Sequence, residues 1–387
     1  MDVVTCISPV NIAVIKYWGK RDENLILPIN DSLSVTLSTD QFHAKTSVLC
    51  SPNLIEDAMW LNGRKQDIGQ KRTQNCLKEI RRLAIESGIE TCMERAKWKV
   101  CIASQNNFPT AAGLASSAAG FACLVYSLAL AHGLPPTVDL TRIARQGSGS
   151  ACRSLHGGFV RWFKGELSDG TDSIARPIVP TNHWPELRIL IAVVNSSTKE
   201  TSSTIGMQQS VLTSELLKYR SEVCVPKRME SMVSAIKEKN FEAFAKLTMQ
   251  DSNQFHAICL DTYPPCVYMN DTSNSIVKLI HLYNEFSGSV RVAYTFDAGP
   301  NAVLFILKDH VSELTALLRY CAKPAENFVR GLPIELSEWA LSEDLRNMAA
   351  NWTNSLNLEY VMHTKIGEGP QALESSQSLL SKAGALV

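Results

Sequence analysis

Residues 109–120 have the sequence PTAAGLASSAAG, a stretch of small or uncharged residues with a single proline at its start. It leads into an uncharged run that reaches residue 131 and has the composition of a good helix, so we expect a loop that opens a helix. The first turn of a helix has unpaired backbone N–H groups and partial positive charge, which together attract an anion. Short side chains let a bulky anion approach the backbone, and two serine hydroxyls add donors. The stretch therefore predicts a phosphate-binding loop.

Two other interpretations fit the same stretch. Small residues are also typical of a tightly packed core helix, and residues 114–134 have about the length of a membrane span. The serine pair, Gly120, His132 and the lack of flanking basic residues disfavour the span. The loop is not a Walker A loop, because the one Gly-Lys pair, Gly19-Lys20, lacks the upstream glycine. The nearest approach to G-x-G-x-x-G begins at Gly147 and fails at its last position.

The composition sets limits on the class of protein. A chain of 387 residues can form two modest domains or one large one. Its 38 basic residues balance 38 acidic ones, which gives no support for binding nucleic acid. The eleven cysteines include no C-x-x-C pair and no zinc spacing, and scattered single cysteines suit a reducing compartment. Because the first four residues run straight into a strand-like segment, we expect no signal peptide, no membrane association and a cytoplasmic location.

Hydrophobic patterns predict a mixture of strands and helices. The predicted strands are 3–7, 12–17, 33–38, 45–49, 58–61, 98–103, 159–163, 187–194, 290–296, 302–307 and 360–366. The predicted helices are 70–87, 114–131, 140–145, 212–223, 227–238, 241–256, 273–286 and 311–320. Because the two types do not alternate strictly, we expect an α+β fold. A shift from strand-rich to helix-rich sequence near residues 187–204 suggests two domains, 1–190 and 191–387.

Four short segments carry polar residues that could contact an anionic ligand, and each has an ordinary alternative. The cluster of Asn11, Lys16 and Lys20 also fits a solvated surface. Residues 146–158, a Gly/Ser-rich segment with Arg153, also fit a flexible linker, and the polar run 195–204 also fits a surface loop. A lone aspartate in a Gly-Pro turn, here Asp297, is usually a turn-former.

Several of these stretches together resemble the mevalonate diphosphate decarboxylases of the GHMP kinase superfamily. The loop fits that superfamily's P-x-x-x-G-L-x-S-S-A signature. The other matching stretches are 9–22 (PVNIAVIKYWGKRD), 106–109 (NNFP), 147–154 (GSGSACRS), 251–256 (DSNQFH) and 294–301 (YTFDAGPN). The resemblance spans residues 3–307 and returns at 365–371, but it is weak over 309–356. The sequence pattern is hardest to interpret over residues 323–356. The run 195–204 has one lysine where the family often has two.

The resemblance implies a fold, a reaction and an assembly. The fold would be a GHMP kinase-type N-terminal α/β domain, ribosomal protein S5 domain 2-like, followed by a smaller C-terminal α/β sandwich, with the active site between them. The reaction would be phosphorylation of the tertiary hydroxyl of mevalonate 5-diphosphate by ATP. That step would release ADP, and loss of the new phosphate and of carbon dioxide would then give isopentenyl diphosphate. The enzyme would act in the cytoplasm, as a homodimer, in isoprenoid and sterol-precursor biosynthesis.

The resemblance also implies roles for particular residues. Asp297 would take the hydroxyl proton or orient the hydroxyl, Lys16 would lie beside it, and Arg153 would bind the substrate carboxylate, with Asn11 converging on the same place. The other substrate-binding residues would be Tyr17, Trp18, Gly19, Lys20, Arg72, Ser148, Gly149, Ser150, Ala151, Cys152, Ser203 and Thr204. ATP would contact Asn107, Pro109, Ala112, Gly113, Leu114, Ala115, Ser116 and Ser117. Magnesium is expected with ATP; its ligands are unassigned, and Ser116 is one candidate.

Two alternatives remain open at this stage. One is a kinase of the same superfamily that stops after phosphoryl transfer; the stretches around Arg153 and Asp297 favour the decarboxylase. The other is a non-catalytic binding protein that has kept the fold, and the presence of Lys16, Arg153 and Asp297 argues against it.

Overall fold

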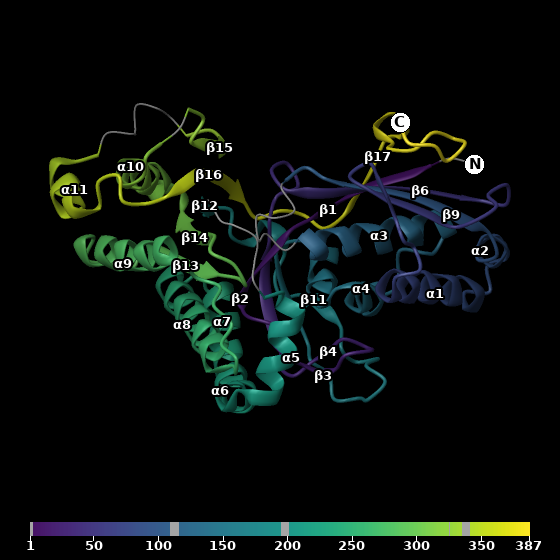
Figure 1. Cartoon of the computed structure of the whole chain (residues 1–387), viewed down its shortest axis with the longest axis horizontal. Helices are drawn as coiled ribbons and strands as arrows, with labels where there is room; N and C mark the ends of the chain where they lie inside the picture. The colour runs from purple at the N-terminus through teal and green to yellow at the C-terminus, as the bar shows by residue number, and fades with distance from the viewer. Residues whose placement is uncertain (1–2, 109–115, 195–200, 325, 335–340) are drawn as a thin grey trace.

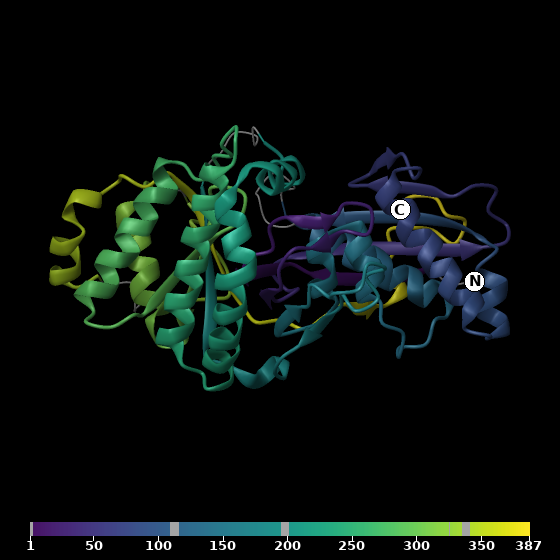
Figure 2. The same cartoon turned by 90° about the horizontal axis from the view of Figure 1, so that it is seen from below.

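A computed structural model describes residues 3–108, 116–194, 201–324, 326–334 and 341–387. The chain forms two parts that lie next to each other along the long axis of the molecule (Figure 1). Each part combines a sheet with helices, and Figure 2 shows the same division from below. The predicted α+β class is therefore confirmed.

The first part is built on a six-stranded sheet. Its strands, in spatial order, are β17 (Gln371–Leu373), β1 (Val4–Pro9), β6 (His43–Ser51), β9 (Lys99–Asn106), β7 (Ala58–Leu61) and β8 (Arg64–Gln66). The helices of this part are α1 (Lys71–Glu86), α2 (Glu90–Arg95), α3 (Ser116–His132) and α4 (Thr141–Gly147). Helix α3 packs on β1 and β6 and is buried on most sides, which explains its almost entirely apolar and small composition.

A four-stranded sheet leads from this part toward the second one. Its strands, in order, are β11 (Ala175–Pro177), β10 (Phe159–Trp162), β5 (Ser32–Thr36) and β2 (Asn11–Ile15). A 3₁₀ helix, Gly149–Leu155, packs against this sheet and against α3 and α4. Strands β3 (Lys20–Asp22) and β4 (Leu27–Pro28) form a separate small hairpin.

The second part is built on a five-stranded sheet. Its order is β13 (Val292–Phe296), β14 (Ala302–Leu307), β12 (Leu187–Val194), β16 (Leu358–Lys365) and β15 (Val329–Gly331). Strand β12 is a nearly continuous apolar run because it lies in the middle of this sheet. The longer helices are α5 (Ser203–Thr213), α7 (Val225–Lys237), α8 (Phe241–Asp261), α9 (Asp271–Phe286) and α10 (Val311–Cys321). Helix α8 contacts both β13 and β2, so it joins the second part to the first.

The chain crosses between the two parts twice, and the crossings are adjacent. One crossing enters β12 and the other leaves β16, where Arg188 pairs with Lys365. The second crossing is hydrogen-bonded to the first part: Ser38 N donates to Lys365 O at 3.0 Å, and Gly367 N donates to Thr36 O at 2.9 Å. After it, β17 adds to the edge of the first sheet beside β1. This crossing is therefore held in place by backbone bonds as well as by the chain itself.

The predicted elements match the structure well where the hydrophobic pattern is strong. Strands 58–61, 187–194 and 302–307 have the predicted bounds, and the other predicted strands differ at their ends. The helix predicted at 212–223 was wrong as one element: α5 begins at Ser203, α6 (Glu215–Tyr219) follows, and residues 220–224 form a π turn. Ser202 caps α5 by accepting a bond from Ile205 N, so the end of the polar run 195–204 starts a helix. No helix among the described residues is long and apolar enough to cross a membrane.

Candidate active site

A buried lysine and an aspartate meet where the two parts join. Lys16 follows β2 directly and Asp297 follows β13, and Lys16 Nζ lies 2.6 Å from Asp297 Oδ1. The lysine side chain is 3% exposed, whereas that of Asp297 is 32% exposed. The pair therefore presents a carboxylate to solvent with an ammonium group behind it.

Arg153 lies in the 3₁₀ helix and is held entirely by neutral oxygen atoms. Its Nε donates to Asn11 Oδ1 at 3.3 Å and to Ser34 Oγ at 3.0 Å, and its Nη1 donates to Ser32 Oγ at 2.6 Å. Its Nη2 donates to Ser150 Oγ at 3.2 Å. Burial lowers the pKa of Arg153, while Cys152 and then Asp297 act in the opposite direction. No carboxylate forms an ion pair with Arg153 in the part of the chain that the structure describes, so its charge is available to an acidic ligand.

Asn11 links β2 to the 3₁₀ helix. Its Nδ2 donates to Ser150 O at 3.0 Å and to Ser154 Oγ at 2.7 Å, while its Oδ1 accepts from Arg153. The amide thus uses both ends and sets the orientation of the guanidinium relative to the strand.

Tyr17 packs against the start of the 3₁₀ helix. A Cβ atom on Gly149 would lie 2.7 Å from Tyr17 Cε1, so this close approach requires glycine. The Tyr17 ring also packs on Trp162, at 4.7 Å between centroids, and burial raises the pKa of its hydroxyl. Burial likewise raises the pKa of the Cys152 thiol to about 12, so at neutral pH this sulfur is an uncharged packing group.

The next three residues have different environments. Trp18 donates from Nε1 to Ser210 Oγ at 2.8 Å and packs edge-on against Phe255, so its indole is anchored within the protein. Gly19 has a φ of +90°, a backbone conformation that favours glycine. Lys20 is nearly buried and pairs with Glu23 at 2.6 Å.

Arg72 and Thr204 bring the two parts together at a second point. Arg72 Nη2 of α1 donates to Thr204 Oγ1 of α5 at 3.4 Å, and Ser203 is the first residue of α5. This contact places two of the predicted substrate-binding residues beside each other although 132 positions separate them.

Of the predicted ATP-binding loop, only the last residues are described. Pro109, Ala112, Gly113, Leu114 and Ala115 lie outside the described residues. Ser116 and Ser117 begin α3, and Ser117 Oγ lies 3.2 Å from Ser148 Oγ. The side chain of Asn107 accepts a hydrogen bond from His43 N at 2.8 Å and donates one to Gln41 O at 3.1 Å.

Four residues near this site received no role from the sequence. Asp251, Ser252 and His256 lie on α8, and Arg220 lies on the π turn. Burial, followed by the charge of Lys16, lowers the pKa of His256 to about 4, so it is neutral at physiological pH. The stretch 251–256 was noted for its resemblance, but a polar residue on a long helix gives no sign that it faces inward.

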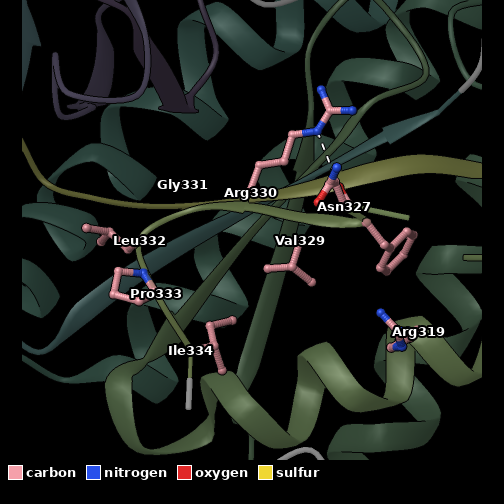
Figure 3. A pocket seen from close by; sticks show the side chains of 9 residues that line it. Arg319, Asn327, Val329, Arg330, Gly331, Leu332, Pro333 and Ile334 are labelled. Atoms are coloured by element: carbon pink, nitrogen blue, oxygen red, sulfur yellow. Dashed lines mark hydrogen bonds between the residues drawn. The ribbon is translucent and has the colours of Figure 1, made fainter. Parts of the chain in front are cut away.

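A separate pocket of about 420 Å³ lies beside β15 (Figure 3). It is lined by Arg319 and residues 327–334, and Arg330 Nε donates to Asn327 O at 3.4 Å along its rim. None of the predicted site residues lines it. No cluster of three or more His, Cys, Asp or Glu side chains suited to a metal occurs among the described residues.

The fold and the site define a two-part α+β protein with a Lys–Asp pair and a buried arginine where its parts meet. Two family models match the chain: the diphosphomevalonate decarboxylase-like N-terminal domain over residues 8–175, and the mevalonate 5-diphosphate decarboxylase C-terminal domain over 189–373. The chain is 55% identical to the diphosphomevalonate decarboxylase of Rattus norvegicus over 96% of its own length and 94% of the relative's. It therefore belongs to the diphosphomevalonate decarboxylase family, whose members decarboxylate mevalonate diphosphate to isopentenyl diphosphate with ATP.

Solved structures agree with this assignment. A mevalonate diphosphate decarboxylase from Trypanosoma brucei superposes with a TM-score of 0.91 at 40% identity, covering 98% of this chain and all of the other. A further relative, solved in complex with MVAPP, AMPPCP and magnesium, has a TM-score of 0.73 at 31% identity, covering 96% and 99% of the two chains. The predicted family and fold are confirmed.

Proposed function

We propose that the meeting point of the two parts phosphorylates and decarboxylates mevalonate 5-diphosphate through Asp297, Lys16, Arg153 and Asn11. The observation that carries the proposal is the 2.6 Å contact between Lys16 and Asp297, residues 281 positions apart. The carboxylate of this pair is the more exposed partner, so a substrate hydroxyl can reach it. Asp297 accepts the proton of the tertiary hydroxyl, or orients that hydroxyl, as its oxygen attacks the γ-phosphate of ATP.

Arg153 is proposed to hold the substrate carboxylate. Each terminal nitrogen of a guanidinium carries two N–H groups, and the structure uses one on Nη1 and one on Nη2. The remaining pair can meet the two oxygens of a carboxylate in parallel. Asn11 fixes the direction of this fork through Nε. A carboxylate held in that way keeps the breaking C–C bond aligned while phosphate leaves and carbon dioxide departs.

The diphosphate end of the substrate is proposed to lie along the cationic and small residues nearby. Lys20, Arg72 and Thr204 supply charge and a hydroxyl, and Ser148–Cys152 supply N–H and hydroxyl donors at the start of the 3₁₀ helix. Trp18 contributes to the proposed diphosphate site by packing, because its indole N–H is already bonded to Ser210.

ATP is proposed to bind at the N-terminus of α3, with magnesium. Ser116 and Ser117 lie on its first turn. The 3.2 Å contact of Ser117 with Ser148 supports a nucleotide position beside the proposed diphosphate-binding residues 148–152. Magnesium is usually held by substrate phosphates, waters and one or two protein oxygens, which suits a site where the described residues form no carboxylate cluster. Ser116 is the proposed protein ligand, and the ion would offset the charge of the transferred phosphoryl group.

The test is Asp297→Asn, with carbon dioxide release and ADP formation measured under saturating substrates. The substitution keeps the shape and removes the base, so turnover should fall by about a hundred- to ten-thousand-fold while both substrates still bind. Asp309→Asn, which alters an exposed aspartate in the turn after β14, is the matched control and should keep normal turnover. A loss below tenfold for Asp297→Asn would remove this residue from the mechanism.

The compartment, assembly and domain division are further proposals. All eleven cysteines are free thiols, which supports a cytoplasmic location. Large apolar side chains are exposed on α5, on α6 and after α8, including Leu212, Tyr219 and Tyr263, which supports a homodimer. Light scattering of the purified protein tests the dimer. The proposed division into residues 1–190 and 191–387 has two exceptions: its boundary falls within β12 of the second sheet, and residues 371–373 lie in the first sheet.

A further inference from the structure

Both polar backbone groups of Lys16 are held by residues distant in sequence. Asp251 Oδ2 accepts a hydrogen bond from Lys16 N at 2.8 Å, and Arg220 Nη2 donates to Lys16 O at 3.2 Å. Asn30 Nδ2 donates to the same carbonyl at 3.1 Å. Lys16 directly follows β2, so these contacts set where the chain goes after the strand and therefore where the ammonium group points.

The two residues that hold Lys16 are themselves a bidentate ion pair. Arg220 Nη1 lies 2.9 Å from Asp251 Oδ1 and Arg220 Nη2 lies 2.9 Å from Asp251 Oδ2, and both side chains are 0% exposed. Arg228 adds a second cation at 2.7 Å from Asp251 Oδ1. Burial raises the pKa of Asp251, but the two arginines outweigh burial and keep the pKa below its usual range. Asp251 is therefore ionised and has a fixed orientation.

Stability alone is a poor explanation for this cluster. Removing two charges from water is costly, and well-packed apolar residues of similar volume often stabilise a protein as much or more. What an apolar replacement could not supply is a donor and an acceptor aimed at the two backbone groups of Lys16. The cluster is therefore better explained by the position in which it holds the backbone of Lys16.

The residue next to Asp251 holds the other member of the catalytic pair. Ser252 Oγ accepts a hydrogen bond from Phe296 N at 3.0 Å, and Phe296 immediately precedes Asp297. One turn further along α8, the ring of His256 packs on that of Phe296 at 6.2 Å. Two consecutive residues of one helix thus bind the backbones that carry Lys16 and Asp297.

We infer that Asp251, Arg220 and Ser252 are positioning residues that set Lys16 and Asp297 at contact distance for the reaction. The inference rests on the proposed roles of Lys16 and Asp297. It assigns a function to the face of α8 that lies between the two parts, and to a buried ion pair that contacts the site through the backbone of Lys16.

The two arginines that pair with Asp251 provide a matched comparison. Arg220 reaches Lys16, whereas Arg228 bonds to Asp251 and Gln254. Arg220→Lys keeps the charge but cannot bond both Asp251 oxygens and the Lys16 carbonyl. Its kcat should fall by at least about tenfold, since a shift of about an ångström at a reacting group can cost on the order of a hundredfold. The KM values for both substrates should stay within about threefold of normal.

Arg228→Lys should lose thermal stability to a similar degree but keep kcat within about threefold. Equal kcat values for the two arginine variants, at matched fractions of folded protein, would overturn the inference. Lys16→Met is included as a reference. If Lys16→Met retains normal turnover, the proposed function fails first; if it loses turnover and Arg220→Lys does not, the inference alone fails.

A second pair of variants avoids the buried charges. Ser252→Ala removes the hydroxyl that binds Phe296 N, and Thr248→Val removes a buried hydroxyl of the same helix that bonds only within the helix, to Phe244 O at 2.8 Å. We expect Ser252→Ala to lower kcat by about three- to tenfold with unchanged KM, and Thr248→Val to leave both constants near normal. Equal effects of the two changes on kcat would contradict the positioning role of Ser252.

Discussion

Arg153 illustrates how single residues in this protein depend on several distant neighbours. Its guanidinium receives support from β2, from β5 and from its own 3₁₀ helix, and all of its described hydrogen-bond partners are neutral. Trp162 lies beneath it, with the ring centroid 5.7 Å from Cζ. Such a shell fixes the planar group and leaves the charge unbalanced, which is a suitable arrangement for capturing an acidic ligand.

Arg153→Lys should therefore fail to support turnover although it keeps the charge. An ammonium group cannot reproduce the four planar hydrogen bonds of Arg153, nor can it make two parallel hydrogen bonds to the oxygens of a carboxylate. We therefore expect turnover to fall by at least about a hundredfold. Carbon dioxide release and the melting temperature are measured together. The control is Arg161→Lys, which should keep normal turnover. Arg161 lies on β10 and forms an ion pair with Asp31. Near-normal release from Arg153→Lys would show that charge alone is sufficient.

The sequence indicated the proposed catalytic residues better than the residues that position them. Lys16, Asp297, Arg153 and Asn11 were singled out by the family resemblance, and the structure joins Lys16 to Asp297 and Arg153 to Asn11. Asp251 and Arg220 could not be identified in this way. A charged residue is usually solvent-exposed, and only the tertiary packing buries these two side chains, Asp251 on α8 and Arg220 on the π turn.

At the scale of elements, the 3₁₀ helix Gly149–Leu155 determines much of the site. The sequence predicted only a Gly/Ser-rich turn there, because the short 3₁₀ form has no hydrophobic period of its own. Two glycines permit close packing at its start. A Cβ on Gly149 would strike the Tyr17 ring, and a Cβ on Gly147 would lie 2.2 Å from Phe121 Cδ1 of α3.

These two glycines give a prediction that separates the substrate side from the nucleotide side. Gly149→Ala should push Tyr17 aside and raise the KM for mevalonate diphosphate by about tenfold or more, because Tyr17 is one of the proposed substrate-binding residues. Gly147→Ala displaces Phe121 of α3, so it should affect the KM for ATP more. Both should lower the melting temperature. The measurement is the ratio of the KM for mevalonate diphosphate to the KM for ATP in each variant. The same ratio in both variants would refute the assignment of Gly149 to the substrate side and Gly147 to the nucleotide side.

Element prediction succeeded where runs were long and apolar and failed where they were short. Strands β12 and β14 lie deep in a sheet, so almost every residue is buried and the pattern leaves little ambiguity. Strands β3 and β4 have three and two residues and were not predicted, because their pairing depends on a local hairpin and not on a buried face. The region 323–356 was difficult for the same reason: β15 and α11 (Glu343–Met348) are short.

For the whole molecule, the sheet of the second part contains a titratable group that links stability to pH. His363 lies on β16, is 6% exposed, and its Nδ1 lies 3.1 Å from Leu332 O. Burial, reinforced by Arg188, lowers its pKa to about 4, compared with an ordinary value of 6.5. Between these values the unfolded chain binds a proton that the folded chain does not.

The free energy of unfolding should therefore fall as the pH is lowered from about 6.5 to about 4. The sign follows from the depressed pKa, since protonation favours the unfolded state in this window. His363→Asn keeps an N–H donor for Leu332 and removes the titration. Melting temperatures measured across this range should decline less steeply for the variant. Parallel curves for the two proteins would mean that His363 does not contribute.

The two-part architecture followed from the family resemblance more than from composition. The shift near residues 187–204 marked the entry into β12, but nothing in the local pattern predicted that residues 371–373 return to the first sheet. A three-residue edge strand gains its stability from a partner that is distant in sequence, and a single sequence gives no information about that partner.

The double crossing described above has a mechanical consequence. Two adjacent antiparallel segments join the halves, and the one that leaves β16 is also tied to residues 36–38 by backbone bonds, so the connection is more rigid than a single tether. Separating the two halves would first require breaking the backbone hydrogen bonds between residues 36–38 and 365–367. The connection between the halves thus helps to set the distance between Lys16 and Asp297 in the protein without ligand.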